Sequence, residues 1–170
     1  MKLASITKHL TFDSAHYLVN PAWTREENIA KFHKCCLYKE NGLEEPHGHT
    51  YHLEVCILGI IDENTGYIID FKELKKILQE GVVEKLDHHL INNIEYFKDK
   101  RVTVENILHF VWDEIADQIN NLRPKEAWLH SIKMWETPDS FAVLDSTMFQ
   151  VEKEIVNIVQ VVLNTRRSNG

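Results

Sequence analysis

The chain contains few cysteines, prolines and glycines: three, four and six, respectively, among 170 residues. Three cysteines, of which Cys35 and Cys36 are adjacent, are too few for a disulfide-stabilised scaffold. The sequence also has no internal repeat and no linker rich in proline, glycine or serine. We therefore expect one folded domain over residues 1–150, followed by a C-terminal extension over residues 151–170.

An excess of basic charge is also absent. The chain has 19 lysines and arginines against 26 acidic residues, for a formal net charge of −7, whereas general nucleic-acid binders need a basic surface. No apolar run approaches the ~20 residues that a membrane span requires, and the N-terminal residues lack the apolar stretch of a secretory signal. These absences predict a cytoplasmic protein that binds neither nucleic acid nor a membrane.

Apolar spacing predicts the order of the secondary-structure elements. Alternation favours strands over residues 2–19, 47–61, 127–137 and 140–149. Helical spacing favours helices over residues 71–86 and 104–122, with a shorter helical segment at 25–33. Turn residues at Asp62–Gly66 predict a hairpin whose return strand starts at Tyr67–Asp70. This order predicts an α+β fold, in which an antiparallel sheet carries two helices on one face.

The C-terminal extension has a helical pattern of its own. The apolar residues of the extension have helical spacing, so that in a helix they would lie on one face: Val151, Ile155, Ile158, Val159 and Val162. We expect an amphipathic helix here, followed by a mobile basic end at Arg166 and Arg167.

His47-Gly48-His49 is the strongest chemical feature of the sequence. On a strand, residues i and i+2 point to the same face, so the two imidazoles can converge on one metal ion. His16, on the first predicted strand, supplies a third nitrogen if the two strands pair. Three histidines form an open zinc site, in which the fourth position is left for water or substrate. From the tripeptide alone, two ordinary surface histidines are an equal alternative.

Three further features carry acid–base or recognition chemistry. Asp87 precedes His88 at a predicted helix end, and a carboxylate beside an imidazole can fix its tautomer and raise its basicity. Cys35 is suited to act as a thiolate, although a zinc ligand or an inert buried residue also fits. Glu136 on a late strand could accept two parallel hydrogen bonds from the amidine-like edge of a pterin. Taken singly, a helix-ending turn and a solvated strand glutamate are the more common explanations of these carboxylates.

Seven motifs between Phe12 and Leu144 occur in the order of one enzyme family. They are Phe12-Asp13-Ser14-Ala15-His16, Glu26-Glu27-Asn28 with Lys34-Cys35, His47-Gly48-His49, Asp62 with Thr65-Gly66-Tyr67-Ile68-Ile69-Asp70-Phe71, Leu86-Asp87-His88-His89, Thr103-Val104-Glu105-Asn106 and Trp135-Glu136-Thr137. This set resembles the 6-pyruvoyl-tetrahydropterin synthase and 6-carboxytetrahydropterin synthase family. The resemblance implies the tunnelling fold, a ββααββ unit, assembled as a homohexamer of two stacked trimers with active sites between subunits.

The resemblance also implies a role for each site residue. Zinc would be held by His16, His47 and His49, and Cys35 would be the proton-abstracting base. Asp87 and His88 would form the proton relay. The pterin would be held by Glu136, Thr103 and Glu105. The substrate implied is 7,8-dihydroneopterin triphosphate, whose side-chain hydroxyls the zinc would coordinate while triphosphate departs.

The segment before His47 departs from the family pattern. The cysteine commonly lies only a few residues before the His-Gly-His motif, whereas here residues 37–45 lengthen that gap. Some relatives use a glutamate just before the histidines as the base, and Glu44 or Glu45 falls at that place. We take Cys35 as the base because it follows Lys34 as in the motif; Cys36, Glu44 and Glu45 are the alternatives.

The family forms two kinds of product, and the motifs divide between them. Residues 67–71 and 86–89 resemble the bacterial enzymes of the queuosine pathway, whereas residues 26–32 resemble the pyruvoyl enzymes. We expect a lyase that forms 6-carboxy-5,6,7,8-tetrahydropterin, with 6-pyruvoyl-tetrahydropterin synthase of a biopterin-type pathway as the alternative. A catalytically silent zinc- or pterin-binding member and a zinc hydrolase are two further hypotheses.

Overall fold

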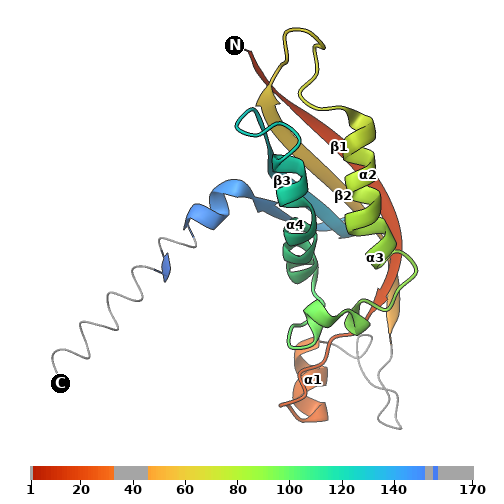
Figure 1. The fold of residues 1–170 in the computed structure, drawn as a ribbon. Helices are drawn as coiled ribbons and strands as arrows, with labels where there is room; N and C mark the ends of the chain where they lie inside the picture. The colour runs from red at the N-terminus through yellow and green to blue at the C-terminus, as the bar shows by residue number, and fades with distance from the viewer. Residues whose placement is uncertain (1, 33–45, 152–154, 157–170) are drawn as a thin grey trace, which may run out of the picture.

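A computed structural model of the chain describes residues 2–32, 46–151 and 155–156. Within these ranges an antiparallel sheet has the strand order β1-β2-β3-β4. The strands are β1 (Leu3–His16), β2 (His47–Ile60), β3 (Ala127–Thr137) and β4 (Ser140–Asp145). The long strands β1 and β2 run side by side over their whole length (Figure 1). Figure 1 shows the sheet curving behind the helices, which lie on one of its faces.

The helices are placed by the apolar stripes that the sequence shows. They are α1 (Arg25–Phe32), α2 (Phe71–Leu78), a π-helical turn (Gln79–Val83), α3 (Glu84–Leu86), two 3₁₀ turns (Ile91–Asn93 and Glu95–Phe97) and α4 (Val104–Asn120). Asp70 caps α2, because its side chain accepts a hydrogen bond from the backbone N–H of Lys72. Thr103 is the N-cap residue of α4 as the sequence predicts, but its hydroxyl makes no capping hydrogen bond.

The core lies between the helices and the inward face of the sheet. Alternate residues of β2 are buried, which confirms the predicted period of two. These inward residues are Tyr51, Leu53, Val55 and Ile57, and they pack with Leu74, Leu86, Ile107, Val111 and Ile115 of the helices. The α+β class and the two covering helices are therefore as predicted. None of the helices in the described part of the chain is both long and apolar enough to span a membrane.

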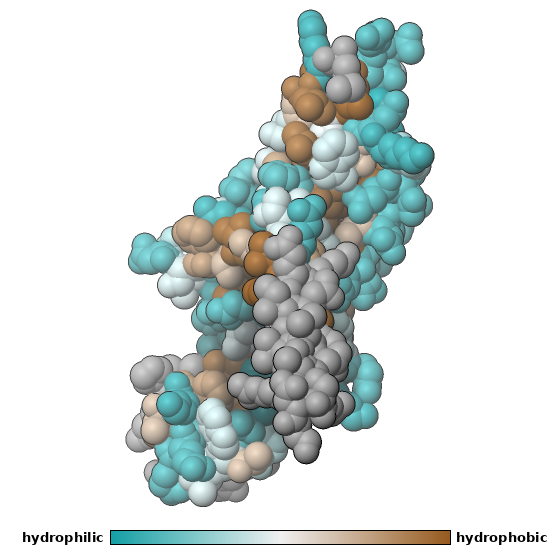
Figure 2. Space-filling view, turned by 90° about the vertical axis from the view of Figure 1, so that its left-hand side faces the viewer, coloured by the Kyte–Doolittle hydropathy of each residue, from teal (hydrophilic) through white to brown (hydrophobic). Residues whose placement is uncertain are grey.

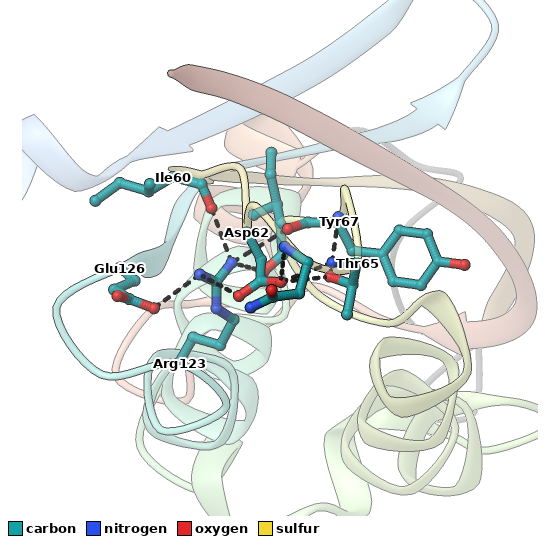
Figure 3. A network of polar contacts seen from close by, with 8 residues as sticks. Ile60, Asp62, Thr65, Tyr67, Arg123 and Glu126 are labelled. Atoms are coloured by element: carbon teal, nitrogen blue, oxygen red, sulfur yellow. Dashed lines mark hydrogen bonds and ion pairs between the residues drawn. The ribbon is translucent and has the colours of Figure 1, made fainter. Parts of the chain in front are cut away.

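The predicted return strand at Tyr67–Asp70 is wrong. These residues form no strand, and β2 pairs instead with β1 on one side and β3 on the other. The reason is Arg123, whose Nη1 donates hydrogen bonds to the carbonyl oxygens of Ile60, Tyr67 and Ile68 at 2.7–3.2 Å (Figure 3). A side chain from beyond α4 thus satisfies the carbonyl groups that a sheet ladder would otherwise have paired.

The end of the last predicted strand is also wrong. β4 stops at Asp145, and residues 146–151 are helical. Asp145 makes the change of direction, because its Oδ1 accepts hydrogen bonds from the backbone N–H and the hydroxyl of Thr147, each at 2.8 Å. The predicted C-terminal helix is present but begins before residue 151, and its continuation past residue 156 lies outside the described residues.

The helical residues after β4 lie against α4. The ring of Phe149 packs on Trp112 with a centroid distance of 4.9 Å and on His109 at 6.0 Å. Other apolar side chains near this contact or on the outward face of β4 are exposed, including Met148, Phe141 and Val143. Figure 2, seen from the side of the C-terminal segment, accordingly mixes brown apolar with teal polar residues at the surface.

Candidate metal centre and active site

Three histidines meet where β1 ends and β2 begins. His16 lies opposite His47 in the strand register, and His49 is two residues further along the same face of β2. The centroids of their rings are 4.4–5.2 Å apart, and one nitrogen from each lies within 4.8 Å of the others. The strand pairing that the sequence predicts for His16 is therefore present, and the three side chains converge.

The nitrogens at the centre of this cluster have the state that a metal requires. His16 Nε2, His47 Nδ1 and His49 Nε2 are buried without a hydrogen-bond partner among the described residues. His16 Nδ1 lies 2.6 Å from the carbonyl oxygen of Val102, so Nδ1 carries the proton and Nε2 keeps its lone pair. Burial lowers the pKa of both His47 and His49, which keeps these imidazoles neutral near pH 7. Neutral, convergent nitrogens fit zinc or a similar divalent ion.

Glu136, near the end of β3, reaches the same cluster. Its Oε1 lies 3.2 Å from His16 Nε2 and 3.8 Å from His49 Nε2. Although the contact with His16 is short, its geometry leaves Nε2 without a proper hydrogen bond. The structure thus brings a carboxylate against the histidines, and not to a separate part of the surface.

Tyr51 also lies beside the histidines, and the sequence analysis did not name it as a site residue. Its side chain is fully buried, and its hydroxyl has no hydrogen-bond partner among the described residues. The ring stacks on Phe12 at 5.1 Å and lies 5.6 Å from the ring of His49. The signal was the alternation itself, because His47, His49 and Tyr51 are successive residues on one face of β2.

The Asp87-His88 pair lies in a turn that β1 holds in place. Asp87 Oδ2 is 2.9 Å from His88 Nδ1, and Asp87 Oδ1 accepts a hydrogen bond from the backbone N–H of Asp13 at 2.8 Å. This backbone hydrogen bond is the main reason why the pKa of Asp87 is lowered. His88 has a positive φ of 59°, which is uncommon for a residue other than glycine. The imidazole of His88 is 78% exposed and is oriented by Asp87.

One cleft joins the two clusters. It has a volume of about 500 Å³, and both His49 and His88 line it, together with Asp13, Thr50 and His89. One histidine of the cluster, His49, therefore lines the same cleft as His88, which Asp87 orients. That arrangement suits proton transfer at carbon or oxygen atoms next to a metal ion.

The remaining predicted site residues either lie away from the histidine cluster or are outside the described part of the chain. Thr103 follows Val102, whose carbonyl contacts His16, and Glu105 is exposed in the first turn of α4. No contact of either side chain with the histidine cluster is found in the described part of the chain. The candidate bases Cys35, Cys36, Glu44 and Glu45 all lie outside the described residues.

Comparison with known proteins points to one family of enzymes. Residues 5–147 match the family described as 6-pyruvoyl tetrahydropterin synthase. The 6-pyruvoyl tetrahydrobiopterin synthase of Drosophila melanogaster is 33% identical over 137 residues, which is 80% of this chain and 76% of that protein. The dihydroneopterin monophosphate aldolase of Pyrococcus furiosus is 33% identical over 133 residues, covering 78% of this chain and 90% of that protein.

The fold agrees as well. The structure of Caenorhabditis elegans 6-pyruvoyl tetrahydropterin synthase superimposes with a TM-score of 0.72 at 25% identity, over 86% of this chain and 97% of that one. The four-stranded antiparallel sheet with its helices is thus the tunnelling fold that the sequence predicts. The chain belongs to the 6-pyruvoyl tetrahydropterin synthase family.

Proposed function

We propose that the protein is a zinc-dependent lyase that acts on 7,8-dihydroneopterin triphosphate and releases triphosphate. The observation that carries this proposal is the cluster of three buried, unpartnered histidine nitrogens, one of whose histidines, His49, lines the same cleft as the oriented His88. A zinc hydrolase needs only the histidines and one carboxylate, and it gives no reason for a second, separately oriented acid–base pair. The family match favours pterin chemistry over hydrolysis.

His16, His47 and His49 would hold the zinc, which supplies Lewis acidity toward the hydroxyl groups of the substrate side chain. The chain's own residues perform the proton transfers. Asp87 holds the His88 imidazole by its Nδ1–H, so that Nε2 can accept or return a proton in the cleft. Cys35 is proposed as the base that takes the first proton, and Glu136 as the acceptor for the N–H groups of the pterin ring.

The product is the point at which sequence motifs and relatives disagree. The motifs favour 6-carboxy-5,6,7,8-tetrahydropterin, but the relatives from Drosophila melanogaster, Dictyostelium discoideum and Homo sapiens are named for 6-pyruvoyl products. We therefore propose 6-pyruvoyl-tetrahydropterin as the product. The sequence motifs favour this product less than the 6-carboxy compound. The aldolase relative supports a second candidate, cleavage of the side chain between carbons to leave a shorter substituent on the pterin.

The product of one incubation decides between these candidates. Purified protein, with its zinc content measured, is incubated with 7,8-dihydroneopterin triphosphate, and the pterin product is identified by mass. We expect release of triphosphate and the mass of the 6-pyruvoyl product. A 6-carboxy mass would restore the queuosine-type reaction, and a shortened side chain would indicate an aldolase. Unchanged substrate with full zinc would leave a silent binding member and overturn the proposed activity.

The base is tested separately, because the segment that carries it is the one that departs from the family pattern. Cys35→Ala, Cys36→Ala and Glu44→Ala are assayed side by side with zinc quantified in each. We expect Cys35→Ala to keep its zinc and lose about 10²–10⁴-fold in rate. An active Cys35→Ala beside an inactive Cys36→Ala or Glu44→Ala would assign the base to the other residue.

Assembly and location belong to the same proposal. We expect a cytoplasmic homohexamer made of two trimers, as the family resemblance implies. Sedimentation equilibrium of the full chain measures its mass directly. A stable monomer or dimer that turns over substrate would contradict the proposed assembly.

A further inference from the structure

We propose that Ser14 is a positioning residue that holds the Asp87–His89 turn at a fixed place beside the histidine cluster. The inference rests on the proposed function, because it concerns the relay of that same site. It assigns to a small, buried hydroxyl the coupling between the two halves of the cleft.

Ser14 is 6% exposed and makes two contacts with the turn. Its Oγ donates to the carbonyl oxygen of Leu86, and the carbonyl oxygen of His89 lies 2.9 Å from the same hydroxyl. These two carbonyls flank Asp87 and His88 on either side. The single proton of this hydroxyl thus lies between two carbonyl oxygens, one at either end of the dipeptide that carries the relay.

The neighbours of Ser14 extend the same clamp along β1. Asp13 donates its backbone N–H to Asp87 Oδ1 and accepts the backbone N–H of His88 at 2.6 Å. The backbone N–H of Ala15 donates to the carbonyl oxygen of His89 at 3.0 Å. Three successive residues of one strand thus hold the turn, and Ser14 is the member that does so through its side chain.

The turn needs such a clamp because its backbone is not relaxed. His88 adopts a left-handed conformation, with φ of 59°, which only a few per cent of residues other than glycine adopt. The imidazole itself is mostly exposed and is not held by packing. Its position in the cleft therefore depends on the hydrogen bonds to β1.

The same strand segment carries a histidine of the metal cluster. Ser14 lies opposite His49 in the register, and His16 follows two residues later on the same inward face. The distance between the relay and the histidine cluster is consequently set within one short piece of backbone. Loss of the Ser14 hydroxyl would loosen the relay while leaving the histidines where they are.

The test is Ser14→Ala, with Ser5→Ala as the matched control. Ser5 is also on β1 but is exposed on the outward face, away from the turn. For Ser14→Ala we expect unchanged zinc content, a KM within about twofold of the original, and a kcat that is at least tenfold lower, since misplacement of a catalytic group acts on the chemical step. Hydrogen exchange should speed up at the amide of His88, whose donor bond to Asp13 lies within the clamp. Ser5→Ala should change none of these quantities.

Two further variants keep the test decisive. Ser14→Thr retains the hydroxyl and should restore kcat, whereas a purely structural role would be disturbed by the extra methyl group in a buried position. If Ser14→Ala does not fold, Ser14→Cys preserves the volume with a weaker donor and should still lower kcat and speed exchange at His88. Unchanged kcat and unchanged exchange in a folded variant would overturn the proposal.

Failure of the inference and failure of the proposed function give different results. If the unsubstituted protein does not convert 7,8-dihydroneopterin triphosphate, the proposed function fails. The role of Ser14 is then tested only by the rate of hydrogen exchange at the His88 amide. If the unsubstituted protein is active and Ser14→Ala matches it in both measurements, the clamp fails and the function stands.

Discussion

The carboxylate of Glu136 lies 3.2 Å from Nε2 of His16, the nitrogen that the Val102 hydrogen bond leaves free. A residue that the sequence assigns to pterin recognition is thus also a neighbour of the metal cluster. The two roles are compatible, because a carboxylate has two oxygens and several acceptor sites. They can be separated by a substitution that removes the charge and keeps the shape.

We expect Glu136→Gln to retain zinc, since the three histidines remain, and to bind a pterin more weakly. The amide presents an NH₂ group to the donors of the pterin and loses the charge assistance, so the loss is about 1.5–3 kcal/mol. Titration calorimetry with a non-reactive pterin measures the affinity. Glu54→Gln, on the exposed face of β2, is the control and should leave the affinity unchanged. Equal affinity for Glu136→Gln and the original protein would remove Glu136 from pterin binding.

Two histidine-to-alanine substitutions on the paired strands β1 and β2 should differ in their effect on zinc affinity. His16→Ala removes a buried ligand nitrogen and should lower zinc affinity by more than the roughly 10–100-fold that loss of an outer partner costs. His52→Ala removes an exposed histidine from the opposite face of β2 and should keep full zinc. Competition with a chromophoric chelator measures both affinities. Full zinc binding by His16→Ala would contradict the site.

The turn at Asp62 predicts a pH-dependent contribution to stability. The backbone N–H and hydroxyl of Thr65 donate to the Asp62 carboxylate and hold its pKa below the usual range (Figure 3). A lowered carboxyl pKa stabilises the folded state above the unfolded pKa of ~3.9, and that stability is lost as the pH falls through the folded pKa.

Asp62→Asn should therefore lower the thermal midpoint at pH 7, and its difference from the unsubstituted protein should shrink in acid. Thermal melts at a series of pH values below 7 record this difference. Comparison of the two proteins cancels the acid sensitivity that Asp87 and Asp145 contribute to both. Glu63→Gln in the same exposed turn serves as the control, for which no midpoint change is expected. A difference that stays constant down to pH 2 would rule out the carboxylate as its source.

At Tyr51, in contrast, we expect a substitution in the core that does not destabilise the fold. Its hydroxyl is buried without a partner, and burial raises its pKa because the charged form is disfavoured. In the metal-free protein, Tyr51→Phe removes an unsatisfied polar group and should be neutral or stabilising by up to about 1 kcal/mol. Urea unfolding of the metal-free protein measures the change. A loss of more than 1 kcal/mol would show that the hydroxyl has a partner in solution.

Phe149 predicts that the segment after β4 contributes to the fold. Its half-buried ring packs on Trp112, so Phe149→Ala should cost about 1–2 kcal/mol, which is less than the 3–5 kcal/mol of a fully buried aromatic residue. Met148→Ala is the control, because that side chain is 47% exposed. Denaturant unfolding compares the two. Equal stability of both variants would mean that the helical segment is not held by this contact.

The parts of the fold that follow local periodicity could be predicted from the sequence. The inward face of β2 and the buried stripe of α4 are defined by spacing, which residues within a few positions of one another determine. Ile68 and Ile69 show where this fails. They form a short buried apolar run that resembles a strand, but their neighbouring carbonyls are bonded by Arg123, some 55 residues away. No local pattern contains that information.

The site shows the same division. His47 and His49 are paired by a two-residue spacing, so their convergence follows from strand geometry alone. Glu136 arrives there through the register of β3 on β2, and the Val102 carbonyl arrives through the chain that precedes α4. Those two contacts depend on tertiary packing, and backbone groups such as Val102 O leave no mark on the side-chain pattern. The sequence therefore predicted the histidine cluster better than its surroundings.

The π-helical turn at Gln79–Val83 sets the direction in which the chain leaves the helices. Gly81 lies so close to α4 in this turn that an added Cβ would come within 2.9 Å of Ile115 Cγ2. The turn contains one residue more than regular α-helix would use for the same rise. Because the wider turn absorbs the extra residue, the helix after it keeps nearly the rotational phase that a regular α-helix one residue shorter would have. Leu86 is therefore buried in the core and Asp87 and His88 meet Asp13 of β1, although the chain before them is one residue longer than a regular helix would need.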